Sequence, residues 1–150
     1  MTYLLDANVV SEIHKRRPDR SVLDWLVETL PYERHLSVLT LGELRRWVEA
    51  RRRRDEVAAA ALEQRVGEVV VSHGRRIVPI TSQIADRWGH LAVPSRVGII
   101  DGLLAATALV HDWTLVTRNT ADVAGPECAR SIRSRRNADR TGPYGPARCG

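Results

Sequence analysis

The stretch that decides the fold is Tyr3-Leu4-Leu5-Asp6-Ala7-Asn8, an apolar run close to the N-terminus that ends at an acidic residue. Such a run predicts a short buried strand over 2–5 that stops at Asp6. A helix is expected to follow it, from Asn8 to about His14. Asp6 is therefore carried toward the interior at the end of a strand, where an unpaired charge is unfavourable.

Helices and further strands alternate along the rest of the chain. Short apolar or β-branched runs predict three more strands, at 35–38, 77–80 and 114–117. Apolar residues at helical spacing predict helices over 22–30, from 40 through 54 and on past a break near Asp55, over 82–91, and over 103–110. The alternation indicates a single α/β domain with a mainly parallel central sheet flanked by helices. In such a fold, ligands bind at the carboxyl ends of the strands.

Three further acidic residues stand beside apolar segments, as Asp6 does. They are Glu43 in Thr40-Leu41-Gly42-Glu43, Asp101 in Gly98-Ile99-Ile100-Asp101-Gly102, and Asp122 in Thr117-Arg118-Asn119-Thr120-Ala121-Asp122. Buried carboxylates need a cation to neutralise them, and a set of oxygen ligands favours Mg²⁺ or Mn²⁺ over zinc. The sequence therefore predicts that the four carboxylates converge on a divalent ion in the folded chain.

Each of these acids also has an explanation that needs no metal. Glu43 stands three residues after Thr40, which is the spacing of a capping box at a helix start. Asp101 could be an N-cap, and Asp122 could cap or solvate a loop. Asp6 has the weakest structural explanation, because it directly follows a buried strand. The occurrence of all four in one chain favours a shared site over four separate structural roles.

Composition indicates one soluble, cytoplasmic protein. The chain has 150 residues, of which 43% are hydrophobic and 27% charged, ordinary values for a globular domain. No apolar run approaches the roughly 20 residues of a membrane span, and we expect neither a signal peptide nor a membrane partner. The two cysteines and five histidines show no ligand spacing, which disfavours a disulfide framework or a zinc site.

The net charge of +5 is concentrated near the C-terminus. Residues 124–150 contain six arginines against two acidic residues, so this segment carries +4 of that charge. The apolar pattern is lost from Gly125 onward. We expect residues 1–124 to form the folded domain and residues 125–150 to be an arginine-rich tail that is disordered or atypical.

Four motifs, in their order along the chain, resemble those of a known family. They are Leu4-Leu5-Asp6-Ala7-Asn8-Val9-Val10-Ser11-Glu12, Ser37-Val38-Leu39-Thr40-Leu41-Gly42-Glu43-Leu44, Ile100-Asp101-Gly102-Leu103-Leu104-Ala105-Ala106-Thr107-Ala108 and Leu115-Val116-Thr117-Arg118-Asn119-Thr120-Ala121-Asp122. Over residues 2–122 the chain resembles PIN-domain ribonucleases, and it is most similar to the FitB-like branch of the VapC toxins. The resemblance implies an enzyme that cuts RNA, forms a homodimer, and is inhibited by a small antitoxin, through which alone it contacts DNA.

The resemblance also implies roles for individual residues. Asp6 and Asp101 match the principal Mg²⁺ ligands of the family, while Glu43 and Asp122 match the second and the last acid of its catalytic set. Supporting hydrogen bonds or RNA contacts are expected from Asn8, Thr117, Arg118 and Asn119.

Two other functions stay open on the sequence alone. One is an enzyme that forms an aspartyl phosphate on Asp6, which requires a second aspartate two residues later and a lysine further along the chain. Here position 8 is Asn8, and the only lysine is Lys15. The second alternative is a PIN-like module that dimerises and binds antitoxin or RNA without cleavage. It is suggested by Val123, which follows Asp122 where the family has phenylalanine, and by a tail that differs from the family's short final strand.

Arginines and tryptophans are the remaining candidates for RNA contacts. Arg45 and Arg46 lie near the expected site and could bind the RNA backbone. The run Arg51-Arg52-Arg53-Arg54 fits either a solvated helix end or a contact to phosphate or antitoxin. Tryptophans could stack on bases, but their spacing among leucines favours core or interface positions. These are Trp25, Trp47, Trp88 and Trp113.

Overall fold

The computed structural model describes residues 1–91, 97–118 and 129–131 of the chain. The strands within these residues are β1 (Tyr3–Leu5), β2 (Arg34–Ser37), β3 (Ile77–Val78), β4 (Thr114–Thr117) and β5 (Ala129–Ser131). The helices are α1 (Ala7–Glu12), α2 (Arg20–Glu28), α3 (Val38–Arg52), α4 (Glu56–His73), α5 (Ser82–His90) and α6 (Ile99–His111). Two 3₁₀ turns, η1 (Pro31–Glu33) and η2 (Gly74–Arg76), precede β2 and β3. The predicted α/β domain is confirmed.

The strands form one parallel sheet in the order β3-β2-β1-β4-β5. The central strand β1 pairs with β2 on one side and β4 on the other, so that Leu5 lies opposite both Leu36 and Val116. The chain first builds outward from β1 through β2 and β3, and later returns to β4 on its other side. The gap between the carboxyl ends of β1 and β4 is therefore the switch point at which such sheets bind ligands.

Side chains alternate between the two faces of the sheet, as the pleat of a strand requires. Leu5 and Val116 belong to the larger core cluster, which α1, α2, α3 and α4 cover. Their neighbours Leu4 and Leu115 point to the opposite face and pack with Leu104 of α6. Both faces of β1 are buried, which explains why this strand is apolar throughout its length.

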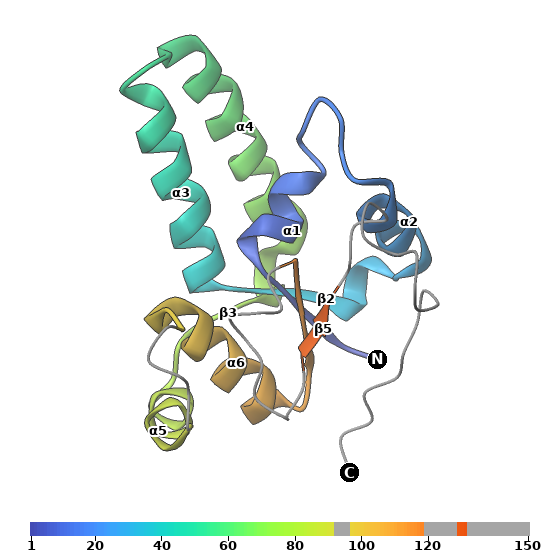
Figure 1. Ribbon diagram of the computed structural model, residues 1–150, viewed down its shortest axis with the longest axis vertical. Helices are drawn as coiled ribbons and strands as arrows, with labels where there is room; N and C mark the ends of the chain where they lie inside the picture. The colour runs from blue at the N-terminus through green and yellow to red at the C-terminus, as the bar shows by residue number, and fades with distance from the viewer. Residues whose placement is uncertain (92–96, 119–128, 132–150) are drawn as a thin grey trace.

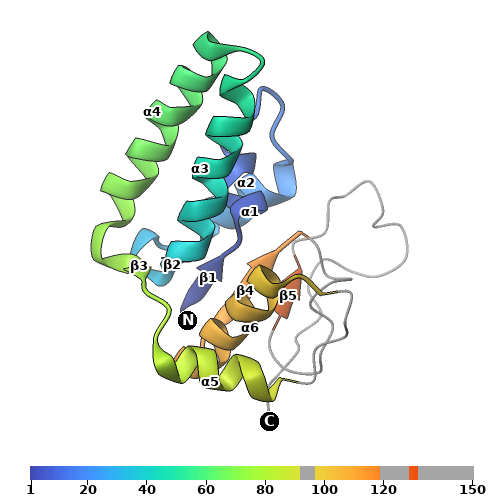
Figure 2. The ribbon, with the colours of Figure 1, turned by 90° about the vertical axis from the view of Figure 1, so that its left-hand side faces the viewer.

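Helices α3 and α4 form a long hairpin that projects from the carboxyl ends of the strands (Figures 1 and 2). Helices α5 and α6 pack together at the opposite end of the molecule, at the bottom of both figures. The turn between α3 and α4 is set by Asp55, whose carboxylate accepts a hydrogen bond from the Ala58 amide and caps α4. This matches the predicted break near Asp55. Among the described residues, no helix is both long and apolar enough to cross a membrane.

Two predicted helix starts are wrong. Helix α3 begins at Val38 with Ser37 as its N-cap, so Thr40 and Glu43 do not form a capping box. The Thr40 hydroxyl instead donates to the carbonyl oxygen of Leu5 at 3.1 Å, because that buried acceptor needs a partner beyond the end of β1. Helix α6 begins at Ile99 with Gly98 as N-cap, which places Asp101 inside the first turn and not at the cap.

Strand β5 was not predicted. It lies within the segment 125–150 that was expected to be irregular, and it pairs in parallel with β4. The remainder of the predicted tail, 132–150, lies outside the described residues.

Candidate active site

Asp6 lies at the switch point of the sheet, directly after β1, and is only 5% exposed. Its amide donates to the carbonyl oxygen of Val116 at 3.1 Å, which continues the pairing of β1 with β4. The Thr117 hydroxyl donates to Asp6 Oδ2 at 2.8 Å, and the Asn8 side-chain amide approaches the same oxygen at 3.4 Å. Oδ1 accepts no hydrogen bond from any residue in the described part of the chain, so this oxygen is available to a ligand.

Glu43 is brought toward Asp6 by the start of α3. The Thr40 hydrogen bond to Leu5 fixes the first turn of α3 against the end of β1, and Glu43 lies one turn further along the helix. Burial raises the pKa of the Glu43 carboxyl, and the negative charges of Asp6 and Asp101 raise it further. Arg46, one turn further along α3, partly opposes this shift. The carboxylates of Asp6 and Asp101 therefore both lie close enough to Glu43 to act on it electrostatically.

Asp101 is held in the first turn of α6, close to the backbone that starts this helix. A Cβ atom placed on Gly98 would lie 3.3 Å from Asp101 Oδ2, which is tighter than an ordinary contact. Glycine at the N-cap therefore leaves room for the carboxylate to fold back over the helix start. The side chain of Asp101 is partly buried, and the helix N-terminus favours its negative charge.

Arg118 follows the strand end that holds Thr117, but its side chain belongs to a separate ion-pair network. Arg118 Nη1 donates to Glu12 Oε2 at 2.5 Å, and Nη2 lies 3.6 Å from a carboxylate oxygen of Asp19. Glu12, which is 3% exposed, also accepts from Lys15 Nζ at 2.6 Å and from the Asp19 amide at 2.8 Å. The network ties α1, the loop after it and the end of β4 together.

The electrostatics of Glu12 explain why a buried carboxylate is stable there. Burial alone would raise its pKa, but the hydrogen bonds from Lys15 and the Asp19 amide, together with the charge of Arg118, lower it overall. Sequence reasoning missed this residue. In the sequence, Glu12 is only a glutamate on the short helix that follows Asp6. Its partner Arg118 is 106 positions away in the chain, so local sequence does not indicate the ion pair.

The structure thus brings together Asp6, Glu43 and Asp101, with Asn8 and Thr117 beside Asp6. The predicted site residues Asn119 and Asp122 lie outside the described residues. No group of three acidic, histidine or cysteine side chains within the described ranges is arranged to hold a metal ion by itself. Asp6 and Asp101 offer oxygen atoms, the ligands that Mg²⁺ and Mn²⁺ prefer, and Asp6 Oδ1 accepts from no described donor. A cation beside them would offset the negative charge that raises the pKa of Glu43.

Comparisons with known proteins find relatives in sequence and in fold. The PIN domain family matches residues 3–122. The chain is 32% identical to the VapC ribonuclease Y4jK of Sinorhizobium fredii, over 79% of this chain and 87% of that protein. It is 31% identical to the toxin FitB of Neisseria gonorrhoeae, over 81% of this chain and 94% of that protein. The crystal structure of FitAcB from the same organism superposes with a TM-score of 0.79 at 26% identity, over 87% of this chain and 98% of that one.

Proposed function

This chain belongs to the PIN-domain family, in the branch that includes VapC and FitB, and from that premise we propose that it is a Mg²⁺-dependent endoribonuclease. We propose further that it is the toxin of a type II toxin–antitoxin pair. The observation that carries the proposal is the approach of Asp6, Glu43 and Asp101 to one another from β1, α3 and α6. The N-cap residues of α3 and α6 are Ser37 and Gly98, so neither Glu43 nor Asp101 is the N-cap residue of its helix.

In this proposal each residue has a defined task. Asp6 and Asp101 hold the metal ion, and Mn²⁺ is an acceptable substitute for Mg²⁺. The ion, when bound, activates water and offsets the charge that develops on the phosphoryl oxygens during cleavage of a phosphodiester bond. Glu43 orients the attacking water. Thr117 and Asn8 hold the Asp6 carboxylate in one orientation through Oδ2 and leave Oδ1 for the ion.

Two residues outside the described ranges complete the proposal. Asp122 would add the last carboxylate of the cluster, and Asn119 would support it or contact RNA. The four acids would then surround the ion from β1, α3, α6 and the segment after β4.

The proposed partners follow from the relatives. Structures of FitAB bound to a DNA fragment and of FitAcB, both at least 25% identical to this chain, contain a toxin together with its antitoxin. We propose that this chain likewise forms a homodimer, is held inactive by a cognate antitoxin, and contacts DNA only through that antitoxin. Its place of action would be the cytoplasm, where the RNA substrate lies.

The direct test is cleavage of a structured RNA by the purified chain, freed of antitoxin, in Mg²⁺ and in EDTA. Cleavage should require the metal, and Asp6→Asn or Asp101→Asn should lower the rate by roughly a hundredfold or more. Asp24→Asn is the matched control, because Asp24 is an exposed aspartate on α2. It should leave cleavage unchanged.

A second function is favoured by the chain that follows Asp122. Val123 and the arginine-rich segment after it depart from the family pattern, so the last acid could be misplaced. The chain would then be a catalytically impaired PIN module that dimerises and binds antitoxin or RNA. Retained RNA binding by a well-folded wild-type protein, with no cleavage in either Mg²⁺ or Mn²⁺, would favour this function over the nuclease.

A further inference from the structure

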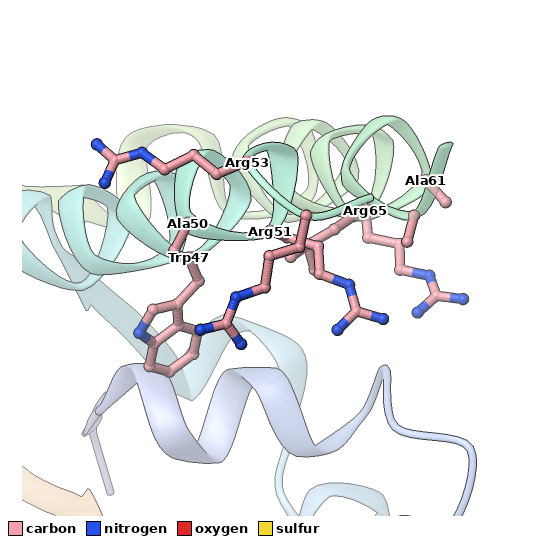
Figure 3. Close-up of a pocket in the computed structure, with 9 residues that line it drawn as sticks. Trp47, Ala50, Arg51, Arg53, Ala61 and Arg65 are labelled. Atoms are coloured by element: carbon pink, nitrogen blue, oxygen red, sulfur yellow. The ribbon is translucent and has the colours of Figure 1, made fainter. Parts of the chain in front are cut away.

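The α3–α4 hairpin carries an open pocket of about 710 Å³ toward its tip. Four arginines line it, namely Arg51, Arg53, Arg54 and Arg65, and Trp47 lines the end nearer to the sheet. Figure 3 shows Trp47, Arg51 and Arg65 on the same side of the hairpin, with the Arg53 side chain pointing away from them. Two of these arginines, Arg53 and Arg54, lie between the end of α3 and the start of α4, and Arg51 belongs to the last turn of α3.

Some arginines of this hairpin are paired with glutamates, and others are not paired with any described residue. Arg45 and Arg52 form ion pairs with Glu63, and Arg52 also pairs with Glu49. By contrast, the exposed guanidinium groups of Arg51 and Arg54 make no hydrogen bond or ion pair with any residue that the structure describes. The pocket therefore presents positive charge that nothing in the described chain neutralises.

Two of the residues that line the pocket follow Glu43 of the acidic cluster along α3. Glu43, Trp47 and Arg51 are spaced four residues apart, so they share one face of the helix, and Arg51 lies about 12 Å along the axis from Glu43. Trp47 is half-buried: one part of its ring packs on the core while it also lines the pocket. An aromatic face thus lies between the carboxylates and the free guanidinium groups.

We propose that this face of α3 is a track for single-stranded RNA, in which a base near the cleaved bond stacks on Trp47 and the next phosphates bind Arg51 and Arg54. The proposal rests on the proposed ribonuclease function and adds to it the path of the substrate strand. Guanidinium groups bind phosphate oxygens through paired hydrogen bonds, and aromatic rings stack on bases without regard to sequence. An acidic peptide would use the same arginines but would have no need of an aromatic ring between them and the carboxylates.

The test measures RNA binding without cleavage. In the Asp6→Asn background, a labelled single-stranded RNA of about ten nucleotides is titrated and its anisotropy is followed at several salt concentrations. The double variant Arg51→Ala/Arg54→Ala should weaken binding roughly tenfold at low salt and reduce the slope of log K against log[salt] by about 1.4, or ~0.7 for each phosphate contact. Arg20→Ala is the control, because Arg20 is an exposed arginine on α2 that does not line the pocket, and it should change neither quantity.

A second measurement tests the aromatic part of the track. RNA should quench part of the tryptophan fluorescence, and Trp47→Phe should abolish that quenching while the other three tryptophans remain. Phenylalanine keeps the core contact of the ring, so this variant should fold. Quenching that is unchanged in Trp47→Phe would remove Trp47 from the track.

The outcomes separate this proposal from the proposed function. Binding that is equally strong in the double arginine variant overturns the track, whether or not the wild-type chain cuts RNA. Absence of cleavage with arginine-dependent binding leaves the track standing and overturns only the enzymatic role. If a polyglutamate peptide displaces RNA at equal charge concentration, the pocket is a site for an acidic peptide, and the RNA track is wrong.

Discussion

At the scale of single residues, Glu43 shows most clearly that the carboxylates crowd one another. Its pKa is raised by burial first, and then by Asp6 and Asp101. A carboxyl whose folded-state pKa is raised contributes stability at acid pH, and this contribution is lost as the pH rises through that pKa. In the metal-free protein near neutral pH, Glu43→Gln should therefore increase the free energy of unfolding, by no more than about 1 kcal/mol because the side chain is partly exposed.

Thermal denaturation in EDTA checks this expectation. The gain in Tm from Glu43→Gln should be larger near pH 7 than near pH 5, because the Glu43 carboxyl of the wild type is more fully ionised at pH 7. The control is Glu49→Gln, which removes an exposed carboxylate that pairs with Arg52 on the same helix and should not raise Tm. Equal effects of the two variants would mean that the acids do not repel one another in the folded chain.

Gly98 leaves space for the Asp101 carboxylate because it has no side chain. Gly98→Ala would place a Cβ atom 3.3 Å from Asp101 Oδ2, so the carboxylate must shift by a few tenths of an ångström. We expect cleavage to fall roughly tenfold, with more Mg²⁺ needed for half-maximal rate, because metal-ligand geometry tolerates little displacement. The measurement is initial rate against Mg²⁺ concentration.

A matched alanine substitution one residue before Glu43 serves as the control. A Cβ atom on Gly42 would meet nothing within 4 Å, and Gly42 lies inside α3. Gly42→Ala should stabilise the protein by about 0.5–1 kcal/mol and leave the Mg²⁺ dependence of the rate as it is. If Gly98→Ala and Gly42→Ala show the same dependence of rate on Mg²⁺ concentration, the space beside Gly98 does not affect the position of the Asp101 carboxylate.

At the scale of secondary-structure elements, the Glu12 network joins α1 to the end of β4, on which Thr117 holds Asp6. Arg118→Met would leave Glu12 buried with two remaining donors, and we expect a loss of about 1–3 kcal/mol in unfolding free energy. Lys15→Met removes a partner of the same carboxylate, but Lys15 is 50% exposed and should contribute less than about 1 kcal/mol. Urea denaturation of the two variants compares these contributions directly.

The pH dependence of these variants has a definite sign. Because the folded-state pKa of Glu12 is lowered, its contribution to stability is present above the unfolded pKa and is lost as the pH falls through the folded one. The difference in stability between wild type and Arg118→Met should therefore shrink in acid. A constant difference from neutral to acid pH would show that Arg118 stabilises the fold through packing and not through Glu12.

The elements also show where sequence reasoning succeeds and where it fails. The strands at Tyr3–Leu5 and Thr114–Thr117 are apolar because both faces are buried, and their positions were predicted closely. The capping box of Thr40 was wrong, because a tertiary hydrogen bond to Leu5 uses its hydroxyl, and local spacing contains no information about that bond. Strand β5 forms by pairing with β4, and the residues Ala129–Ser131 have no apolar pattern that would predict a strand.

The candidate site was predictable to a similar extent. The approach of Asp6, Glu43 and Asp101 followed from acids placed at strand ends and helix starts in a parallel fold. The ion pair of Glu12 with Arg118 was not foreseen, because it joins residues that only the folded sheet brings together. Sequence therefore indicated the candidate groups of the site, and the structure was needed to find the residues that hold the strand ends in place.

At the scale of the whole molecule, the three acids come from parts of the chain that the sheet only partly connects. Asp6 follows β1, Glu43 lies on α3, and Asp101 opens α6 on the opposite face of the sheet. A cation bound by them would link both layers of helices to the central strand, and a ligand that binds only the folded state stabilises it by mass action. Mg²⁺ at about 100 times its Kd should then add ~2.7 kcal/mol, or roughly 5–10 °C in Tm.

The shift in Tm should depend on the carboxylates and not on ionic strength. Asp101→Asn should abolish most of it, whereas Asp24→Asn, which changes the net charge equally on exposed α2, should retain it in full. Sodium chloride at matched ionic strength should give no comparable shift, because screening acts on all surface charges alike. A shift that survives in Asp101→Asn would place the cation elsewhere on the molecule, and the convergence of carboxylates would then have to be explained without a metal.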